Sequence, residues 1–271
     1  MSEVDIVEKF YDENSEKEWN RLSGFRYEFE ITKTMMKKHM NKGKVLDIGG
    51  GPGRYSLYLA SIGYDVTLVD LSKNNIEFAK NKSREMGLSI KAYQCDARHL
   101  EKLDLGEYDN ILIMGPFYHL FEASDRKKVL LDSLRHLSEN GKIFASFISI
   151  FGGFNYYFSE CPHELINEPE KSFFDSAAND ESWAGSAFTQ AYFIDADEIE
   201  DFFNGCGLKK TTIFGQEGIA APRLMDLEDL EKTPEDARDY WLEISLKLCE
   251  NKKYFPYSSH IMYIGERAQR K

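Results

Sequence analysis

The feature that most constrains this chain is a glycine-rich stretch between two apolar runs, VLDIGGGPGRYSLYLASIGYDVTLVD, at residues 45–70. Four glycines and Pro52 lie within five residues, directly after an apolar run that predicts a buried strand over 45–48. Apolar residues at helical spacing then predict a helix over 55–62, and a second strand pattern follows over 65–70. This order predicts two parallel strands joined by a crossover helix.

The same alternation of apolar strands and amphipathic helices continues to residue 149. On a parallel sheet, ligands bind beyond the carboxyl ends of the strands. The loops after residues 48, 70, 95 and 114 are therefore expected to converge on one site. The expected elements are a helix from Ser72 to about 86, strands over 88–95 and 108–114, a helix marked by Leu130, Leu134 and Leu137, and a strand over 142–149.

The pattern breaks at residue 151. The next segment, FGGFNYYFSECPHELINEPEKSFFDSAANDESWAGSAFTQ, has no clean period and is rich in Phe, Tyr and Trp. Roughly forty residues without regular structure are unusual inside a compact domain, so this insertion predicts a lid or a small subdomain.

Regular patterns resume at Asp195 with a short helix, and a strand is expected over 208–214. Thr233-Pro234-Glu235-Asp236 is a strong helix start, with a cap, a proline and two acids. A final strand is expected over 260–265. The residues expected to line one face of the helix are Ala237, Tyr240, Trp241, Ile244 and Leu248.

The glycine loop lacks the spacing of the loops that bind pyrophosphate. The dinucleotide pattern G-x-G-x-x-G, counted from Gly49, requires a glycine where Arg54 stands. The phosphate-loop pattern also fails, because no Gly-Lys-Ser/Thr follows. Instead Asp47 precedes the glycines on the strand. This acid would repel a pyrophosphate and attract an amino group or a cation.

Four motifs in order resemble those of the S-adenosylmethionine-dependent methyltransferases of the seven-stranded, Rossmann-like class (class I). VLDIGGGPGRYSLYLA is similar to their first motif, VTLVDLS to the second, YQCDARHL to the segment that contacts adenine, and YDNILIMGPFYHL to the fourth-strand motif. The resemblance is close over residues 41–150 and looser over 195–215 and 259–266. It implies an α/β fold with a Rossmann-like, seven-stranded, mostly parallel sheet and helices on both faces, plus an aromatic-rich lid insertion after the fifth strand.

On this resemblance we expect four parts in the chain. An N-terminal helical cap spans 1–40, and the cofactor-binding Rossmann-like core spans 41–150. The lid or substrate insertion spans 151–194. The C-terminal part of the core spans 195–271 and includes a further helix at about 234–250.

The cofactor implied by the resemblance is S-adenosyl-L-methionine, with S-adenosyl-L-homocysteine as product. Its zwitterionic tail, sulfonium and adenosine carry no phosphate, which agrees with the failed phosphate patterns. Glycines permit close backbone approach, and the helix start after the loop favours the tail carboxylate. The resemblance implies this cofactor-binding set: Tyr11, Asp47, Gly49, Gly51, Gly53, Arg54, Asp70, Leu71, Asp96, Ala97, Met114 and Gly115.

Several of these residues carry a second interpretation. Asp70 is expected to accept both ribose hydroxyls, although an acid there can also cap a helix, a role that Ser72 already offers. Asp96 is expected to bind the adenine amino group, or else to shape a surface turn. Tyr11 is expected to reach the methionine carboxylate, or simply to pack on its helix. Arg54 either pairs with a carboxylate or covers the helix start.

The best candidate for a general base is His119, in GPFYHL after the fourth strand, because histidine titrates near neutrality. A purely structural histidine there is equally consistent with the sequence. Tyr118 has the same two interpretations. His163 and His260 are weaker candidates, because the first lies in the insertion and the second begins a strand.

The insertion suggests the acceptor. Its aromatic residues would enclose a small organic molecule, reached by in-line displacement, or would glue the lid to the sheet. A peptide or protein, for example at a carboxylate, is the alternative acceptor. A catalytically silent cofactor-binding protein and a nicotinamide oxidoreductase are less favoured. The aromatic residues are Phe151, Phe154, Tyr156, Tyr157, Phe158, Phe173, Phe174 and Trp183.

Charge and composition limit the other classes. The formal net charge of −12 disfavours nucleic-acid substrates, because the chain repels phosphate backbones. The four cysteines form no metal-ligand pattern, so no metal is expected and the thiols are expected to be reduced. No apolar run is long enough to span a membrane and the acidic start does not resemble a signal peptide, so a cytoplasmic location is expected.

Overall fold

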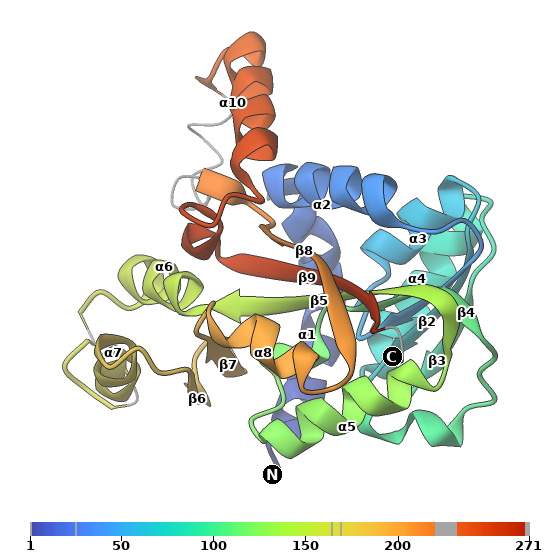
Figure 1. The fold of residues 1–271 in the computed structure, drawn as a ribbon, viewed down its shortest axis with the longest axis horizontal. Coiled ribbons are helices and arrows are strands. Elements are labelled where there is room, and N and C mark those ends of the chain that lie inside the picture. The colour runs from blue at the N-terminus through green and yellow to red at the C-terminus, as the bar shows by residue number, and fades with distance from the viewer. Residues whose placement is uncertain (1, 25, 164, 169, 220–231, 269–271) are drawn as a thin grey trace.

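The computed structural model describes residues 2–268 apart from 25, 164, 169 and 220–231. At its centre, parallel strands lie side by side in the arrangement that the alternating sequence predicted (Figure 1). The strands are β1 (Lys44–Ile48), β2 (Asp65–Asp70), β3 (Lys91–Gln94), β4 (Tyr108–Ile113) and β5 (Leu137–Ser149). Their order is β3-β2-β1-β4-β5, and each neighbouring pair is parallel.

Two C-terminal strands, β8 (Leu208–Gly215) and β9 (His260–Arg267), complete the expected Rossmann-like sheet. β9 is antiparallel to β5, with His260 opposite Ile148, and β8 is antiparallel to β9. The sheet is therefore mostly parallel, with β9 reversed. Because of this reversal, the first residue of β9 lies beside the carboxyl end of β5, which is the ligand-binding edge of a parallel sheet.

Helices cover both faces of the sheet. Alternate residues of β1 point to opposite faces, so Leu46 packs in one apolar cluster with Leu130, while Val45 packs in another with Ile31 and Leu59. The first face carries α5 (Ala123–Leu134) and α8 (Glu198–Asn204). The second carries α2 (Arg26–His39), α3 (Arg54–Ser61) and α4 (Lys73–Glu85).

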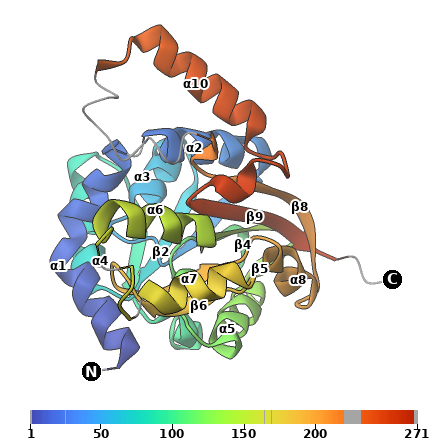
Figure 2. The ribbon, with the colours of Figure 1, turned by 90° about the vertical axis from the view of Figure 1, so that its left-hand side faces the viewer.

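The N-terminal helix α1 (Glu3–Gly24) packs along α4, as Figure 2 shows. The helix is interrupted at Asn14, where the backbone leaves helical geometry and forms a kink. Asp12 fixes α1 to the start of α4, because its Oδ1 accepts from Ser72 Oγ at 2.5 Å and from Asn74 N at 3.1 Å.

The insertion has regular structure, which its sequence did not predict. It forms α6 (Ile150–Glu160), α7 (Glu170–Ala178) and a hairpin of β6 (Trp183–Ser186) with β7 (Gln190–Ile194). β7 also pairs in parallel with the end of β5, so the hairpin extends the main sheet to nine strands among the described residues. The aromatic side chains of this segment pack on one another, for example Tyr157 on Phe173 at a ring distance of 4.8 Å. This mutual packing explains why no simple period is visible.

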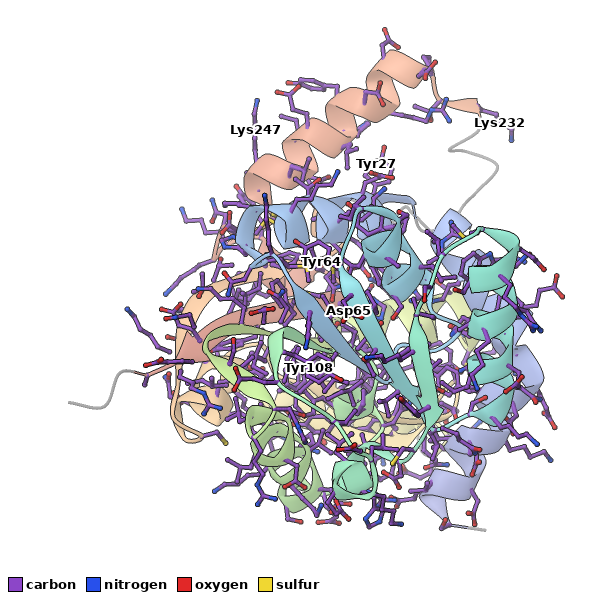
Figure 3. All side chains as sticks on the ribbon, turned by 90° about the vertical axis from the view of Figure 1, so that its right-hand side faces the viewer. Tyr27, Tyr64, Asp65, Tyr108, Lys232 and Lys247 are labelled. Atoms are coloured by element: carbon purple, nitrogen blue, oxygen red, sulfur yellow. The ribbon has the colours of Figure 1, made fainter. Side chains whose placement is uncertain are left out.

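The helix expected at 234–250 is present as α10 (Glu235–Leu248), but its predicted apolar face is wrong. α10 stands away from the body of the molecule (Figures 1 and 3), and Tyr240 and Trp241 are 62% and 50% exposed. The helix instead turns Leu242, Ser245 and Leu246 toward the body. Both sets recur at helical spacing, so the sequence alone did not select between the two faces.

Candidate functional site

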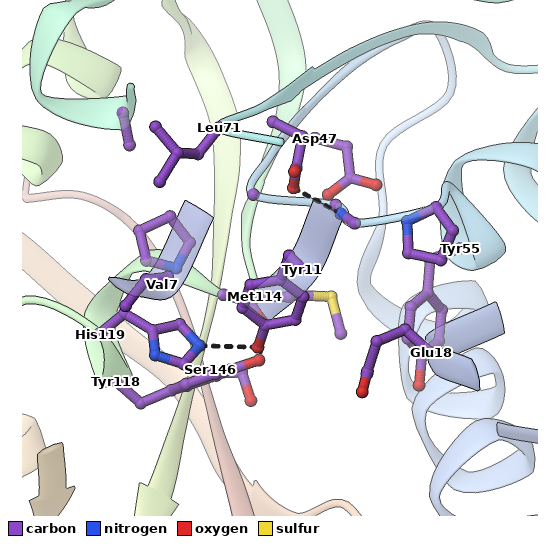
Figure 4. Close-up of a pocket in the computed structure, with 18 of the residues that line it drawn as sticks. Val7, Tyr11, Glu18, Asp47, Tyr55, Leu71, Met114, Tyr118, His119 and Ser146 are labelled. Carbon is purple, nitrogen blue, oxygen red and sulfur yellow. Dashed lines mark hydrogen bonds between the residues drawn. The ribbon is translucent and has the colours of Figure 1, made fainter. Parts of the chain in front are cut away.

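A pocket opens at the carboxyl ends of the parallel strands, where the loops after β1, β2, β3 and β4 converge (Figure 4). Val4, Val7 and Tyr11 of α1 close it from the other side. The structure brings together here nearly all the residues proposed to bind the cofactor. Those lining the pocket are Tyr11, Asp47, Gly49, Gly51, Arg54, Asp70, Leu71, Asp96, Ala97, Met114 and Gly115, together with Tyr118 and His119.

Gly49 and Gly115 bring the loops after β1 and β4 into direct contact. A Cβ at Gly115 would lie 2.7 Å from the carbonyl oxygen of Gly49, so any side chain there would push the loops apart. Gly49 and Gly51 both have positive φ, at +71° and +58°, which favours glycine. A Cβ on Gly51 would have only Asn75 Nδ2, at 3.9 Å, within 4 Å. The loop therefore presents bare backbone to the pocket.

Gly53 does not line the pocket among the described residues. It has φ +84° and precedes α3, and a Cβ there would lie 3.0 Å from Ala79 Cβ on α4. Its visible role is thus to let α3 start and pack closely against α4.

Asp47 is a buried acid with one unused oxygen. Its Oδ2 accepts from Ser56 Oγ at 2.7 Å, whereas Oδ1 has no hydrogen-bond partner among the described residues. Burial, together with the nearby charge of Asp70, raises the pKa of Asp47 to about 7, although the Ser56 hydrogen bond lowers it. A buried oxygen without a donor is the site at which a bound ammonium or N–H group would be most favourable.

Asp70 is held in place by the loop it faces. Its Oδ2 accepts from Gly51 N at 2.8 Å, and its Oδ1 accepts from Ser72 N at 2.9 Å and Asn75 Nδ2 at 3.1 Å. Burial raises the pKa of Asp70 against these three donors. The cap of α4 is Ser72, which accepts from Asn75 N, so Asp70 orients the loop and is not the cap itself.

Asp96 has a strong partner inside the protein. Its carboxylate accepts from the side chain of Arg98, with Nη2 to Oδ2 at 2.6 Å, and from the Arg98 backbone N–H at 2.9 Å. Despite burial, these bonds and the Arg98 charge hold the pKa of Asp96 below its usual range. Asp96 thereby caps the short helix η1 (Ala97–Lys102) at the rim of the pocket.

His119 joins three separate segments. Its Nδ1 lies 2.8 Å from the carbonyl oxygen of Gln190 in β7, and its Nε2 lies 2.7 Å from the Tyr11 hydroxyl in α1 (Figure 4). A carbonyl only accepts, so Nδ1 carries the proton and Tyr11 donates to Nε2. Burial lowers the pKa of His119 to about 4, opposed by the Gln190 bond, which differs from the near-neutral titration expected from sequence.

Tyr118 and Arg54 are also engaged. The Tyr118 hydroxyl donates to the carbonyl oxygen of Met114 at 2.6 Å, and burial raises the Tyr118 pKa. The Arg54 guanidinium lies over the ring of Trp19 at 4.7 Å and near Phe29 at 5.3 Å. It thus covers α3 with a cation–π contact on the pocket side.

The aromatic residues of the insertion do not line the described pocket, and their mutual packing agrees with the second interpretation, in which they hold the insertion together. Tyr157, Phe173 and Trp183 are buried in a separate apolar cluster. They hold the hairpin and helices of the insertion together.

The part of the pocket beyond the cofactor loops is polar instead. It is lined by Glu18, Arg21, Glu28, Ser146, Gln216 and His260. Sequence reasoning missed all of these residues except His260, which it ranked low, because they come from α1, α2, β5 and the two C-terminal strands. Gln216 directly follows β8 and His260 begins β9, and these two positions become informative once the strand directions are known.

This polar wall consists of matched pairs. Arg21 Nη1 donates to Glu28 Oε2 at 2.8 Å, and Gln216 Nε2 donates to Thr32 Oγ1 at 3.0 Å. Glu217, just behind the wall, pairs with Nδ1 of His260. Glu28, Glu217 and His260 each offer one atom that could coordinate a metal ion, and these three atoms lie within 4.8 Å of one another. Each carboxylate already has a partner within the protein, Arg21 for Glu28 and the Nδ1 of His260 for Glu217.

Comparison with known proteins agrees with this geometry. The family described as "Methyltransferase domain" matches residues 45–141. A glycine/sarcosine N-methyltransferase from Parasynechococcus marenigrum is 31% identical over 146 residues, which cover 52% of this chain and 51% of that protein. A ubiquinone biosynthesis O-methyltransferase from Rickettsia akari is 28% identical over 132 residues, covering 48% and 51%. The chain thus spans about half the length of these curated relatives.

Solved structures share the fold over most of the chain. The magnesium protoporphyrin IX methyltransferase of Synechocystis PCC 6803, solved with bound SAH, superposes with a TM-score of 0.59 at 12% identity, covering 98% of this chain and 100% of that one. An S-adenosylmethionine-dependent methyltransferase from Clostridium acetobutylicum gives 0.56 at 13% identity, covering 90% and 91%. The chain has the Rossmann-like fold of these methyltransferases, and residues 45–141 match the family described as "Methyltransferase domain".

The cofactor of this class is S-adenosyl-L-methionine, and the residues present suit it. The unpartnered Asp47 oxygen suits the amino group, and the bare glycine loop suits close approach of the tail. Among the helices of the described residues, none is both long and apolar enough to cross a membrane.

Proposed function

We propose that this protein transfers a methyl group from S-adenosyl-L-methionine to a small polar acceptor. The observation that carries the proposal is the pocket in which Asp47, the glycine loop and Asp70 meet at the carboxyl edge of the sheet. S-adenosyl-L-methionine supplies the activated methyl group. The residues of this chain bind it, orient it and exclude water.

In this proposal Asp47 Oδ1 receives the amino group of the methionine tail, and the backbone of Gly49 and Gly51 packs against that tail. Asp70 accepts from the ribose through Oδ2, which keeps acceptor capacity beyond its bond from Gly51 N, whereas Oδ1 already accepts from Ser72 N and Asn75 Nδ2. Asp96, Ala97 and Leu71 hold adenine at the rim. Met114 and Gly115 line the opposite side.

We propose a different role for His119 and Tyr118 from that of a base. His119 fixes Tyr11 over the pocket, because its two nitrogens bind Tyr11 and β7 at once. Tyr118 fixes the carbonyl of Met114 beside the pocket. Both residues shape the reaction site, and the α1 helix that His119 holds through Tyr11 keeps bulk water away from it.

The acceptor follows from the polar wall. Glu18, Arg21 and Glu28 are paired with one another, but an apolar acceptor beside them would still displace the water around these charged groups. An acceptor with its own polar groups can take the place of that water. The names of the curated relatives also refer to small-molecule chemistry, namely glycine/sarcosine N-methylation and ubiquinone biosynthesis. A peptide acceptor is the alternative.

The test is transfer of labelled methyl from S-adenosyl-L-methionine into a cell extract separated by size, with S-adenosyl-L-homocysteine measured in parallel. Asp70→Ala serves as the inactive variant and Asp65→Ala, at the exposed start of β2, as its matched control. We expect label in the small-molecule fraction, lost in Asp70→Ala alone. Label on polypeptide would support the peptide alternative. Failure of the protein to bind S-adenosyl-L-homocysteine in calorimetry would contradict the proposal altogether.

A further inference from the structure

We propose that His260 is the general base of this methyl transfer and that Glu217 positions it. This inference rests on the proposed function and assigns a catalytic residue to the same pocket. It concerns acceptors that arrive with a proton on the atom to be methylated.

His260 lies where a base is needed. It is the first residue of β9, and the antiparallel pairing with β5 sets it opposite Ile148 at the carboxyl edge of the sheet. It lines the same pocket as Met114 and Gly115, and its ring centroid is 6.2 Å from that of Tyr118. Its side chain is 18% exposed, so a ligand in the pocket can reach it while bulk water has little access.

Glu217 fixes the orientation of the ring. Its Oε1 accepts from Nδ1 of His260, and its Oε2 accepts from the His260 backbone N–H at 2.9 Å. Ser258 Oγ also donates to Oε2, so the carboxylate itself is held. With Nδ1 bound to a carboxylate, the proton stays on that nitrogen and the lone pair of the neutral ring lies on Nε2. Among the described residues, the hydrogen bonds of His260 involve its backbone and Nδ1, and none involves Nε2.

His119 has no such free atom. Both of its nitrogens are already bound, one to Tyr11 and the other to the Gln190 carbonyl. His260 is thus the histidine of the pocket whose acceptor nitrogen is available to a substrate.

The charged groups around His260 favour proton uptake. Burial lowers its pKa, but Glu217 and Glu28 raise it and outweigh both burial and the charge of Arg21, so that the pKa ends above its ordinary value. The same contacts, led by the charge of His260, hold the pKa of Glu217 low despite its burial. The groups facing His260 are Glu217 after β8, Glu28 of α2, Arg21 of α1 and the neutral hydroxyl of Tyr118.

In the proposed step, the acceptor atom bonds to the methyl carbon, and the carbon–sulfur bond breaks with its electron pair left on sulfur. The acceptor proton passes to Nε2 of His260. The imidazolium so formed is stabilised by the Glu217 carboxylate. The products are the methylated acceptor, a neutral thioether and protonated His260, which returns its proton to solvent.

The first experiment measures the protonation state and the pKa of the His260 ring. The full-length chain labelled with ¹⁵N-histidine is titrated by NMR, with Glu217→Gln and His260→Gln to assign the signal. We expect a neutral ring protonated on Nδ1 and a pKa above the usual histidine value of about 6.5. In Glu217→Gln we expect this pKa to fall by about one unit or more.

The second experiment measures the rate of methyl transfer as a function of pH. Labelled S-adenosyl-L-methionine is supplied with the small-molecule fraction of a cell extract, and the rate of label transfer is followed against pH. We expect the wild-type rate to rise with pH through the NMR pKa of His260, and Glu217→Gln to shift that rise to lower pH. His260→Gln should lower the rate at neutral pH about 10²–10⁴-fold with unchanged binding of S-adenosyl-L-homocysteine. His163→Gln, in the exposed part of the insertion, is the control.

The outcomes separate the two proposals. The assignment of the base is overturned if His260→Gln transfers label at a rate within threefold of the wild type. It is also overturned if Glu217→Gln leaves the pH dependence of that rate unchanged. If the wild type transfers no label, the proposed function fails and the NMR titration alone decides on His260. A neutral ring protonated on Nε2, or a pKa unmoved by Glu217→Gln, then overturns the inference.

Discussion

Replacing Asp47 with asparagine should stabilise the folded protein at high pH and, at the same time, weaken the binding of the cofactor. Asp47 is 1% exposed, and its only hydrogen bond among the described residues is from Ser56. An asparagine oxygen can keep that bond. The substitution therefore removes a buried charge with little loss of packing.

The magnitude follows from the pKa. The pKa of Asp47 is raised by burial from 3.8 to about 7, so between these values the unfolded chain is ionised while the folded chain holds the proton. A carboxyl with a raised folded pKa contributes stability at low pH that is lost as pH rises through this window. From about pH 5 to pH 8 the wild type should lose about 2.5 kcal/mol of unfolding free energy relative to Asp47→Asn.

Binding should change in the opposite direction. In the proposed function, ionised Asp47 meets the amino group of the methionine tail, and an amide cannot supply that charge. Removing one partner of a buried charge pair typically costs about 2 kcal/mol or more, which corresponds to roughly a 30-fold weaker complex. In Asp47→Asn, the greater stability of the cofactor-free protein and the weaker cofactor binding have the same cause, the unpartnered oxygen of Asp47 in the wild type.

The assay is urea unfolding of wild type and Asp47→Asn at about pH 5 and pH 8, with calorimetric titration of S-adenosyl-L-homocysteine at the higher pH. Asp65→Asn, at the exposed start of β2 (Figure 3), is the matched control. A stability difference that does not grow with pH would refute the account of Asp47 as a buried, proton-holding acid. Unchanged affinity would refute its contact with the amino group.

Other substitutions test separate parts of the structure. Gly115→Ala should lower the affinity for S-adenosyl-L-homocysteine, measured by calorimetry, at least about tenfold, because the alanine Cβ would lie 2.7 Å from the Gly49 oxygen. An unchanged affinity would show that the loops adjust. Tyr157→Phe should leave the unfolding free energy unchanged or raise it by about 1 kcal/mol, because the buried hydroxyl has no partner among the described residues; a clear loss in urea unfolding would reveal one. Tyr11→Phe should lower the unfolding free energy by about 1–2 kcal/mol, because Nε2 of His119 loses its donor; an unaltered midpoint would contradict this.

The strands around the cofactor pocket could be predicted because the signals for them are local. Each of β1, β2 and β4 is a short apolar run, and a crossover helix between two strands makes them parallel. Parallel strands end at one edge, so the sequence alone could place residues far apart in the chain, such as Asp47, Asp70 and Gly115, in one pocket. Their roles toward the cofactor stay predictions.

The insertion and α10 were less predictable, because their burial depends on distant partners. An aromatic-rich segment without a period either lines a cavity or packs on itself, and composition does not distinguish these cases. Here Phe173 contacts Tyr157, Trp183 and Phe193, so the rings are used within the insertion. On α10 two faces had helical spacing, and contact with the body selected the one with Leu242 and Leu246.

His260 was undervalued because a residue at the start of a strand was taken to lie far from the ligand-binding edge. That reasoning holds only for a strand parallel to its neighbours. β9 is reversed, so its start meets the end of β5 and enters the pocket. The sequence of β9 carries no signal of its direction, because direction is set by pairing with β5 and β8.

The pocket is divided between a part inside the segment that matches the methyltransferase-domain family and a part outside that segment. The matched methyltransferase domain ends at residue 141 and contains Asp47, the glycine loop, Asp70 and Asp96. The polar wall lies outside it, because Glu18, Arg21 and Glu28 precede the matched segment and Ser146, Gln216 and His260 follow it. The residues that we propose to hold the methyl donor thus lie inside the matched segment. In our proposal the acceptor lies against the wall, so substitutions of His260 and of the Arg21–Glu28 pair should change acceptor turnover more than cofactor binding.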